Sequence, residues 1–178
     1  KLSPTEIKAI ENGIPNIMYL EMGYFKTRLF KILWGYQSYL DGRGINGHSV
    51  LMRWEYWKTA IQIIQKNLLL GVGTGDVQDS FNTEYEFSNS SLFKEYRLRA
   101  HNQFLTYGVS FGIIGMLSFL FIMFYPLVKL HFYKNNIYFA FFSIIFLSML
   151  TEDTLEVQAG INLFAFFKPT SIDLSGPR

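Results

Sequence analysis

A long uncharged run in the second half of the chain constrains the fold more than any other feature. The residues from Gly108 to Leu130 are mostly apolar, number roughly 23, and include no charge before Lys129. A helix needs ~20 such residues to cross the hydrocarbon core of a bilayer. Tyr107 and Tyr125 lie toward its two ends, and tyrosine is enriched where membranes meet water. The run therefore predicts a transmembrane helix.

A second apolar segment follows, from Ile137 to Leu150. It is short for a membrane span at roughly 14 residues, but a helix that continued through Glu152 and Asp153 would be longer. The connection between the two segments is short and basic, so the positive-inside rule predicts that it is cytoplasmic. The long segment before Gly108 is then expected on the outer, periplasmic side.

The composition fits a membrane protein and excludes several other classes. Aromatic residues make up 18% of the 178 residues and the mean hydropathy is +0.15, a combination typical of integral membrane proteins. The net charge of +2 lacks the basic excess of a nucleic-acid-binding protein, so we predict no nucleic-acid partner. The absence of cysteine excludes disulfides and thiolate metal sites. Because the chain starts at Lys1 without an initiator methionine, we expect further membrane helices upstream.

The first part of the chain combines a helix start, an aromatic-rich stretch and a loop. Ser3-Pro4-Thr5-Glu6 resembles a helix N-terminus. The stretch from Tyr19 to Tyr39 is aromatic and carries interspersed basic residues, which fits a helix lying on the bilayer surface. It fits equally well a packed helix of an extramembrane domain. The glycine-rich residues from Asp41 to Gly47 predict a loop.

An amphipathic helix is predicted from Val50 to about Lys66, with Ser49 as its N-cap. Apolar residues recur along it at spacings of three and four: Leu51, Trp54, Trp57, Ile61 and Ile64. Arg53 projects near the centre of this apolar face. A buried guanidinium needs an anionic partner, or it must reach water past the tryptophans or stack on them. Both interpretations remain open.

A glycine-rich turn, Gly71 to Asp76, follows that helix. It matches neither the P-loop nor the dinucleotide-binding pattern, so we predict that its glycines end the helix and turn the chain. A further short helix is expected from Val77 to Phe87.

The strongest candidate site lies where the polar part of the chain meets the apolar run. His101 stands there with Arg97 and Arg99, and a titratable imidazole among fixed positive charges suits chemistry on an anionic group. The same residues could instead anchor a helix end among lipid headgroups. Three carboxylates, Glu152, Asp153 and Glu156, are predicted on the same side of the membrane. Such carboxylates could bind metal, move protons or hold arginines, although for Asp153 we favour solvation of a helix end.

Several motifs together resemble the C-terminal half of the O-antigen ligase superfamily, over roughly residues 53–167. They are Arg53-x-x-x-Trp57, Leu70-Gly71-Val72-Gly73-Thr74-Gly75-Asp76, Ala100-His101-Asn102-Gln103-Phe104-Leu105, Phe111-Gly112-Ile113-Ile114-Gly115, Thr151-Glu152-Asp153-Thr154-Leu155-Glu156 and Phe164-Ala165-Phe166-Phe167. The resemblance implies a metal-independent membrane glycosyltransferase without a cofactor. It would transfer a glycan from undecaprenyl diphosphate to an acceptor hydroxyl, lipid A–core in the ligases proper, at the periplasmic face of the bacterial inner membrane.

The resemblance also implies roles for particular residues. His101 and Arg53 fall on catalytic positions, and no clear match exists for a second family arginine. Substrate-binding roles are expected for Arg97, Arg99, Asn102, Glu152 and Glu156. The expected partners are a lipid-linked glycan donor, a glycolipid or glycan acceptor, and membrane lipids. Polysaccharide polymerases and protein O-oligosaccharyltransferases share the pattern, and a non-enzymatic, membrane-anchored module that binds a lipid or a partner is the alternative from another class.

We therefore predict an all-α, multi-pass integral membrane protein. Its predicted parts, in order, are a periplasmic segment (1–99) with the amphipathic helix (50–66), a helix end running into a transmembrane helix (100–130), a cytoplasmic loop (131–136), a second transmembrane helix with a periplasmic acidic turn and a short apolar return (137–167), and a flexible tail (168–178).

Overall fold

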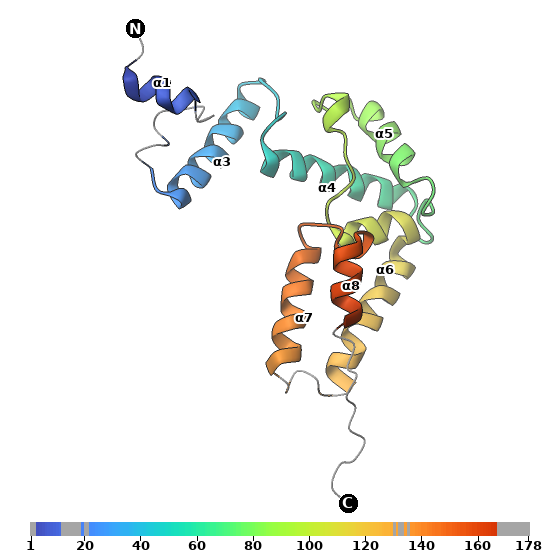
Figure 1. Cartoon of the computed structure of the whole chain (residues 1–178). Helices are drawn as coiled ribbons and strands as arrows, with labels where there is room; N and C mark the ends of the chain where they lie inside the picture. The colour runs from blue at the N-terminus through green and yellow to red at the C-terminus, as the bar shows by residue number, and fades with distance from the viewer. Residues whose placement is uncertain are drawn as a thin grey trace, which may run out of the picture. The chain divides into compact units, whose positions relative to one another are not determined.

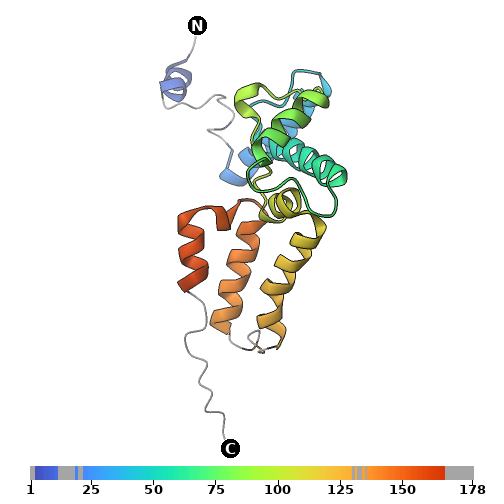
Figure 2. The ribbon, with the colours of Figure 1, turned by 90° about the vertical axis from the view of Figure 1, so that its right-hand side faces the viewer.

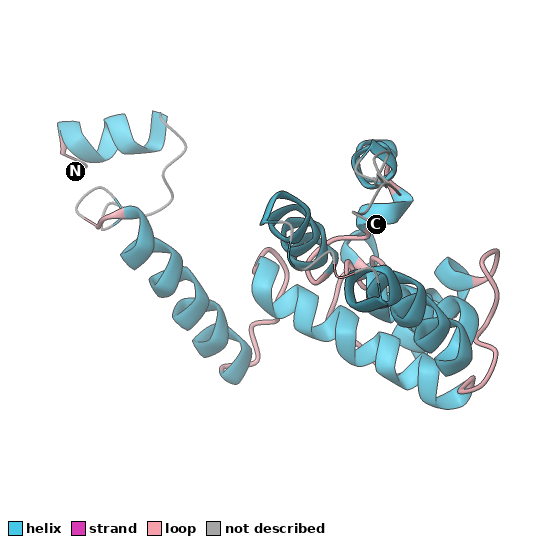
Figure 3. Cartoon of the chain, turned by 90° about the horizontal axis from the view of Figure 1, so that it is seen from below, coloured by secondary structure: helices cyan, strands magenta, loops and turns pink. Residues whose placement is uncertain are grey.

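The computed structural model describes residues 3–11, 19, 22–129, 131, 134 and 136–166, and in these ranges all regular secondary structure is helical (Figures 1 and 3). The all-α prediction is thus confirmed for the described residues. The helices are α1 (Pro4–Glu11), α3 (Tyr24–Leu40), α4 (Ser49–Lys66), α5 (Val77–Phe87), α6 (Gln103–Lys129), α7 (Asn136–Met149) and α8 (Gln158–Phe166), with short 3₁₀ turns η1 (Lys94–Tyr96) and η3 (Thr154–Glu156). The chain divides into two compact units, residues 1–52 and 53–178.

The first unit contains α1, α3 and the loop that leads to α4. At the start of α1, the Ser3 amide donates to the Glu6 carboxylate at 2.6 Å and the Glu6 amide donates to the Ser3 hydroxyl at 3.2 Å. This reciprocal pair is a capping box, as the Ser-Pro-Thr-Glu sequence indicates. In α3 the buried residues are Gly35 and Ser38, whereas one whole side carries exposed apolar residues: Phe25, Leu29, Ile32, Leu33, Tyr36, Tyr39 and Leu40. Within its own unit, α3 is therefore not a packed helix with a buried apolar face.

The buried face of α4 differs from the predicted one. Tyr56, Thr59, Ala60 and Ile63 are buried, whereas Trp54 is 67% and Ile61 is 46% exposed. The hydroxyl of Tyr56 donates to the carbonyl of Tyr96 at 2.9 Å, so this ring can be buried without losing a hydrogen bond. The apolar spacing located the helix but assigned the wrong side to the core.

A kink divides α6, and the glycine turn after α4 is bonded to it. Gly112 has φ 66° and ψ −167°, which interrupts the helix. The carbonyls of Val109 and Ser110 accept hydrogen bonds from the amides of Val72 and Gly73 at 2.8 and 2.9 Å, and the Ile113 amide donates to Leu68 at 2.8 Å. Backbone groups that the kink frees are thus paired by the turn.

Helices α6, α7 and α8 lie side by side (Figures 1 and 2). Met123, Ile145 and Met149 form a buried cluster between α6 and α7, surrounded by phenylalanines from both helices. By length and hydropathy, α6 is the helix in the described ranges that could cross a membrane. The multi-pass topology stays a prediction.

Helix α7 ends at Met149, so it gains no length by continuing through Glu152 and Asp153. The side-chain amide of Asn102 donates to the Leu150 carbonyl at 2.9 Å. The chain then turns through η3 into α8, where Gly160 packs directly on the Thr154 carbonyl and leaves no room for a Cβ. The three carboxylates therefore lie on a turn between two apolar helices, not on a helix.

Candidate functional site

His101 is held at the start of α6 in a left-handed backbone conformation, with φ 48°. The residue before it is fixed because the indole N–H of Trp57 donates to the Ala100 carbonyl at 3.0 Å. The residue after it caps α6, since the Asn102 side-chain oxygen accepts the amides of Phe104 and Leu105, both at 3.1 Å. Asn102 thus caps α6, and the position of this cap sets the position of His101.

Glu152 connects the two residues for which catalytic roles are predicted. One carboxylate oxygen accepts a hydrogen bond from the Arg53 guanidinium at 2.7 Å, and the other lies 3.4 Å from Nδ1 of His101. The side chains are 35%, 35% and 54% exposed for Arg53, His101 and Glu152, so their ion pairs contribute little to stability, ~1 kcal/mol or less. Of the two interpretations of Arg53, the structure therefore favours an anionic partner.

The ring of Tyr56 completes the surroundings of the imidazole, with its centroid 5.9 Å from that of His101. Burial raises the pKa of the Tyr56 hydroxyl, although the charge of Arg53 opposes this. The hydroxyl thus stays protonated near neutral pH and keeps donating to Tyr96. This contact was not predicted, although Tyr56 lies next to Trp57 and one turn after Arg53 in the helix.

A second set of contacts lies on the acidic turn. Arg99 is 3.3 Å from the Glu156 carboxylate, and the Thr106 hydroxyl donates to Asp153 at 2.7 Å. The preferred interpretation of Asp153 as a solvated helix end is wrong, since its half-buried carboxylate accepts a hydrogen bond from α6. The side chain of Gln103 accepts the Leu155 amide at 2.7 Å, which ties η3 to the same helix.

Arg97 is not part of this cluster. Its guanidinium lies 3.7 Å from Glu86 and donates to the Leu92 carbonyl at 3.3 Å. The chain between η1 and α6 is not helical, so Arg97 is not one helical turn before His101. The substrate-binding role predicted for Arg97 finds no support in these contacts.

The site borders two hollows. The first has a volume of about 570 Å³ and is lined by His101, Ser148, Glu152, Asp153, Thr154, Glu156, Val157, Ala159 and Gly160. The second, of about 510 Å³, is mostly apolar and is lined by Trp54, Trp57, Lys58, Ile61, Gln62, Asn102, Phe104, Leu105 and Leu150. The first hollow thus brings the imidazole together with three carboxylates in an otherwise mostly apolar wall, and the second offers an apolar surface that suits the hydrocarbon part of a ligand.

The pKa of Glu156 is raised by burial and by the nearby charge of Asp153, while Arg99 lowers it. A carboxyl group whose pKa is higher when folded than when unfolded makes the protein less stable as the pH rises through these two values. We therefore expect the melting temperature of the wild type to fall relative to that of Glu156→Gln as the pH rises from about 4, where an unperturbed glutamate ionises, to neutral pH. Thermal unfolding in detergent across this range measures the difference, and a constant difference would contradict the expected titration.

A family model described as O-antigen ligase matches residues 16–120. No curated protein and no solved structure matches the chain.

Proposed function

The chain belongs to the O-antigen ligase family, and from this premise we propose that it takes part in transfer of a glycan from undecaprenyl diphosphate to an acceptor hydroxyl. Members of the family are inner-membrane proteins, and the family implies an enzyme of the glycosyltransferase type. The observation that carries the proposal is the Glu152 carboxylate, which contacts both Arg53 and His101. We place the reaction at the periplasmic face.

In the proposed step the acceptor oxygen attacks the anomeric carbon while the bond from that carbon to the diphosphate oxygen breaks. The acceptor proton passes to Nε2 of His101, and the leaving diphosphate gains one negative charge. Glu152 faces Nδ1, so it favours the tautomer that carries a proton there and leaves Nε2 free to act as a base. Arg53 stabilises the charge on the leaving group, because a guanidinium has further N–H groups besides the one bonded to Glu152.

The neighbouring apolar hollow supports a lipid-linked donor. Its lining includes the exposed Trp54, the half-buried Trp57 and residues at the start of α6, and Lys58 is the cation in its wall. An isoprenoid chain could bury apolar surface there while its diphosphate reaches the Arg53 side of α4. Glu156, which pairs with Arg99, lines the hollow beside His101, where we place the acceptor.

Ligases and polymerases of surface polysaccharide would share this chemistry, as would protein O-oligosaccharyltransferases. Loss of a ligase leaves long glycan chains on the lipid carrier, whereas loss of a polymerase leaves single repeat units. The length distribution of carrier-linked glycan in cells that lack the full-length protein therefore separates the two. We take ligase activity, with lipid A–core as acceptor, as the proposal.

Glu152→Gln tests the positioning role of the carboxylate. Gln keeps the size and one acceptor oxygen but removes the charge, so we expect kcat to fall about 10–100-fold with a smaller change in KM. Glu152→Asp should recover part of the loss. The measurement is transfer of labelled glycan from the lipid-linked donor by the full-length protein in membranes.

The matched control is Glu95→Gln, since Glu95 is an exposed carboxylate on η1 outside the cluster. It should leave kcat unchanged. Equal losses in Glu95→Gln and Glu152→Gln, or an unchanged rate in Glu152→Gln, would refute the positioning role.

A further inference from the structure

Helix α3 carries an apolar surface that the rest of its own unit does not cover. At about 100° of rotation per residue, its exposed apolar side chains, apart from Tyr24 and Trp34, fall within an arc of about 120°. They form the apolar arc, which consists of Phe25, Leu29, Ile32, Leu33, Tyr36, Tyr39 and Leu40. An exposed apolar stripe of this width along a whole helix marks a surface that contacts a partner or a membrane.

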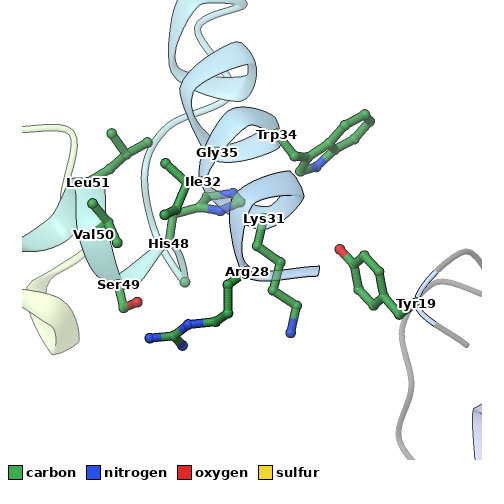
Figure 4. A pocket seen from close by; sticks show the side chains of 11 residues that line it. Tyr19, Arg28, Lys31, Ile32, Trp34, Gly35, His48, Ser49, Val50 and Leu51 are labelled. Carbon is green, nitrogen blue, oxygen red and sulfur yellow. The ribbon is translucent and has the colours of Figure 1, made fainter. Parts of the chain in front are cut away.

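The opposite side of α3 is the one that packs on the chain. Gly35 and Ser38 are buried there, and His48 lies against Gly35, where an added Cβ would meet Nδ1 of His48 at 2.8 Å (Figure 4). The Ser38 carbonyl accepts a hydrogen bond from the Arg43 amide at 2.9 Å. The first unit therefore holds α3 by the side opposite the apolar arc and leaves the arc itself open.

The charges of α3 identify an anionic bilayer surface as the partner. The helix contains Lys26, Arg28 and Lys31 and no acidic residue. By the same rotation, Lys26 falls about 20° beyond Leu33, at one edge of the apolar arc. Arg28 falls about 20° beyond Tyr39, at the other edge. Long basic side chains in these places extend their charges to headgroup phosphates while the apolar residues between them enter the acyl chains.

We propose that α3 lies in the plane of an anionic bilayer surface, with the apolar arc among the upper acyl chains and with Lys26 and Arg28 on headgroup phosphates. Tyr36 and Tyr39 then place their rings at the level where membranes meet water, where tyrosine is enriched. The inference goes beyond the proposed function and does not depend on it, because the depth of a helix in a bilayer can be measured without glycan transfer.

Spin labelling of the whole chain in vesicles tests the inference. The sequence has no cysteine, so a single cysteine introduced at Leu29, Leu33 or Tyr36 carries the only nitroxide. In vesicles of equal parts phosphatidylglycerol and phosphatidylcholine, these labels should be accessible to oxygen but not to a water-soluble nickel complex, at a depth of about 5–10 Å. Labels at Thr27 and Lys31, which project away from the apolar arc, should be accessible to the nickel complex.

Two outcomes would overturn the inference. If the nickel complex reaches the labels on the apolar arc as readily as it reaches a label at Lys31, the arc faces water. If neither oxygen nor the nickel complex reaches them, the arc is covered by protein, either another part of the chain or a second copy.

Neutral variants test the cations at the edges of the arc. Lys26→Gln and Arg28→Gln should each lower the ratio of inserted to free label at Leu33 about fivefold, the effect of one basic residue near an anionic surface. The ratio is read at a salt concentration at which both EPR spectra are present, because salt screens this attraction. The matched control is Lys31→Gln, which removes the same charge from the side away from the arc. An equal effect of Lys31→Gln, no effect of Arg28→Gln, or insertion that salt does not weaken would overturn the role of the edge cations.

Discussion

In the full-length protein, His101→Ala is expected to lower the rate of glycan transfer by about 10²–10⁴-fold, the usual contribution of a positioned general base. The imidazole is held by three neighbours: Glu152 at Nδ1, the ring of Tyr56, and the Asn102 cap that follows it. Removing the side chain removes the group that takes the acceptor proton. Transfer of labelled glycan in isolated membranes measures the rate.

The backbone of His101 makes a second variant necessary. With φ 48°, this residue is in the left-handed region, which asparagine tolerates better than alanine. His101→Asn therefore removes the base with less strain, and we expect it to lose as much activity as His101→Ala. If His101→Asn transfers at the normal rate, the histidine serves the conformation and not the chemistry. His131→Ala, an exposed histidine beyond the other end of α6, should leave transfer unchanged.

Local signals predicted the helices well. The Ser3–Glu6 pattern located the start of α1, and the predicted range from Val77 to Phe87 matches α5. The glycines after α4 do turn the chain, as predicted from their spacing. These signals involve residues close in sequence, so local hydrogen bonding and backbone preferences decide them.

The orientation of α4 could not be read from its sequence. Trp54 and Ile61 are more hydrophobic than Thr59 and Ala60, yet the latter are buried. Small side chains allow close packing, and Tyr56 brings a hydroxyl that bonds to Tyr96. A periodicity in hydropathy cannot distinguish a face that packs on the protein from a face available to a lipid, because both are apolar.

The contacts of the candidate site were predicted only in part. The order of the apolar segments predicts that His101 and the carboxylates are on one side of the membrane. For Arg53, an anionic partner was one of two predicted options. The sequence did not identify the partner as Glu152, which is 99 residues away, because this contact depends on where α7 ends and how the chain turns. The end of α7 is set by a bond from Asn102, which is itself a tertiary contact.

Gly112→Ala is expected to destabilise the protein by about 3 kcal/mol or more and to abolish transfer. The φ and ψ of Gly112 lie in a region open almost only to glycine, and an added Cβ would overlap the backbone of Leu69. The change would separate the kink of α6 from the glycine turn and break the hydrogen bonds of Val72 and Gly73 to it. Because α6 begins at the cap beside His101, the change in the helix should also displace His101 and so abolish transfer. Thermal unfolding in detergent, with transfer measured on the same preparations, checks both effects.

Two further glycines test whether the contact between the glycine turn and the kink of α6 is the cause of the destabilisation. Gly71→Ala should destabilise similarly, since a Cβ there would meet the Ser110 carbonyl carbon at 2.5 Å from the other side of the same contact. Gly75→Ala is the matched control, because Gly75 belongs to the same turn but faces open space, and its change should cost less than about 0.5 kcal/mol. The double variant Gly71→Ala/Gly112→Ala should lose less free energy of unfolding than the two single variants lose in sum, because both changes disrupt the same contact. Strict additivity, or a loss in Gly75→Ala equal to that in Gly112→Ala, would show that the turn and the kink do not support each other.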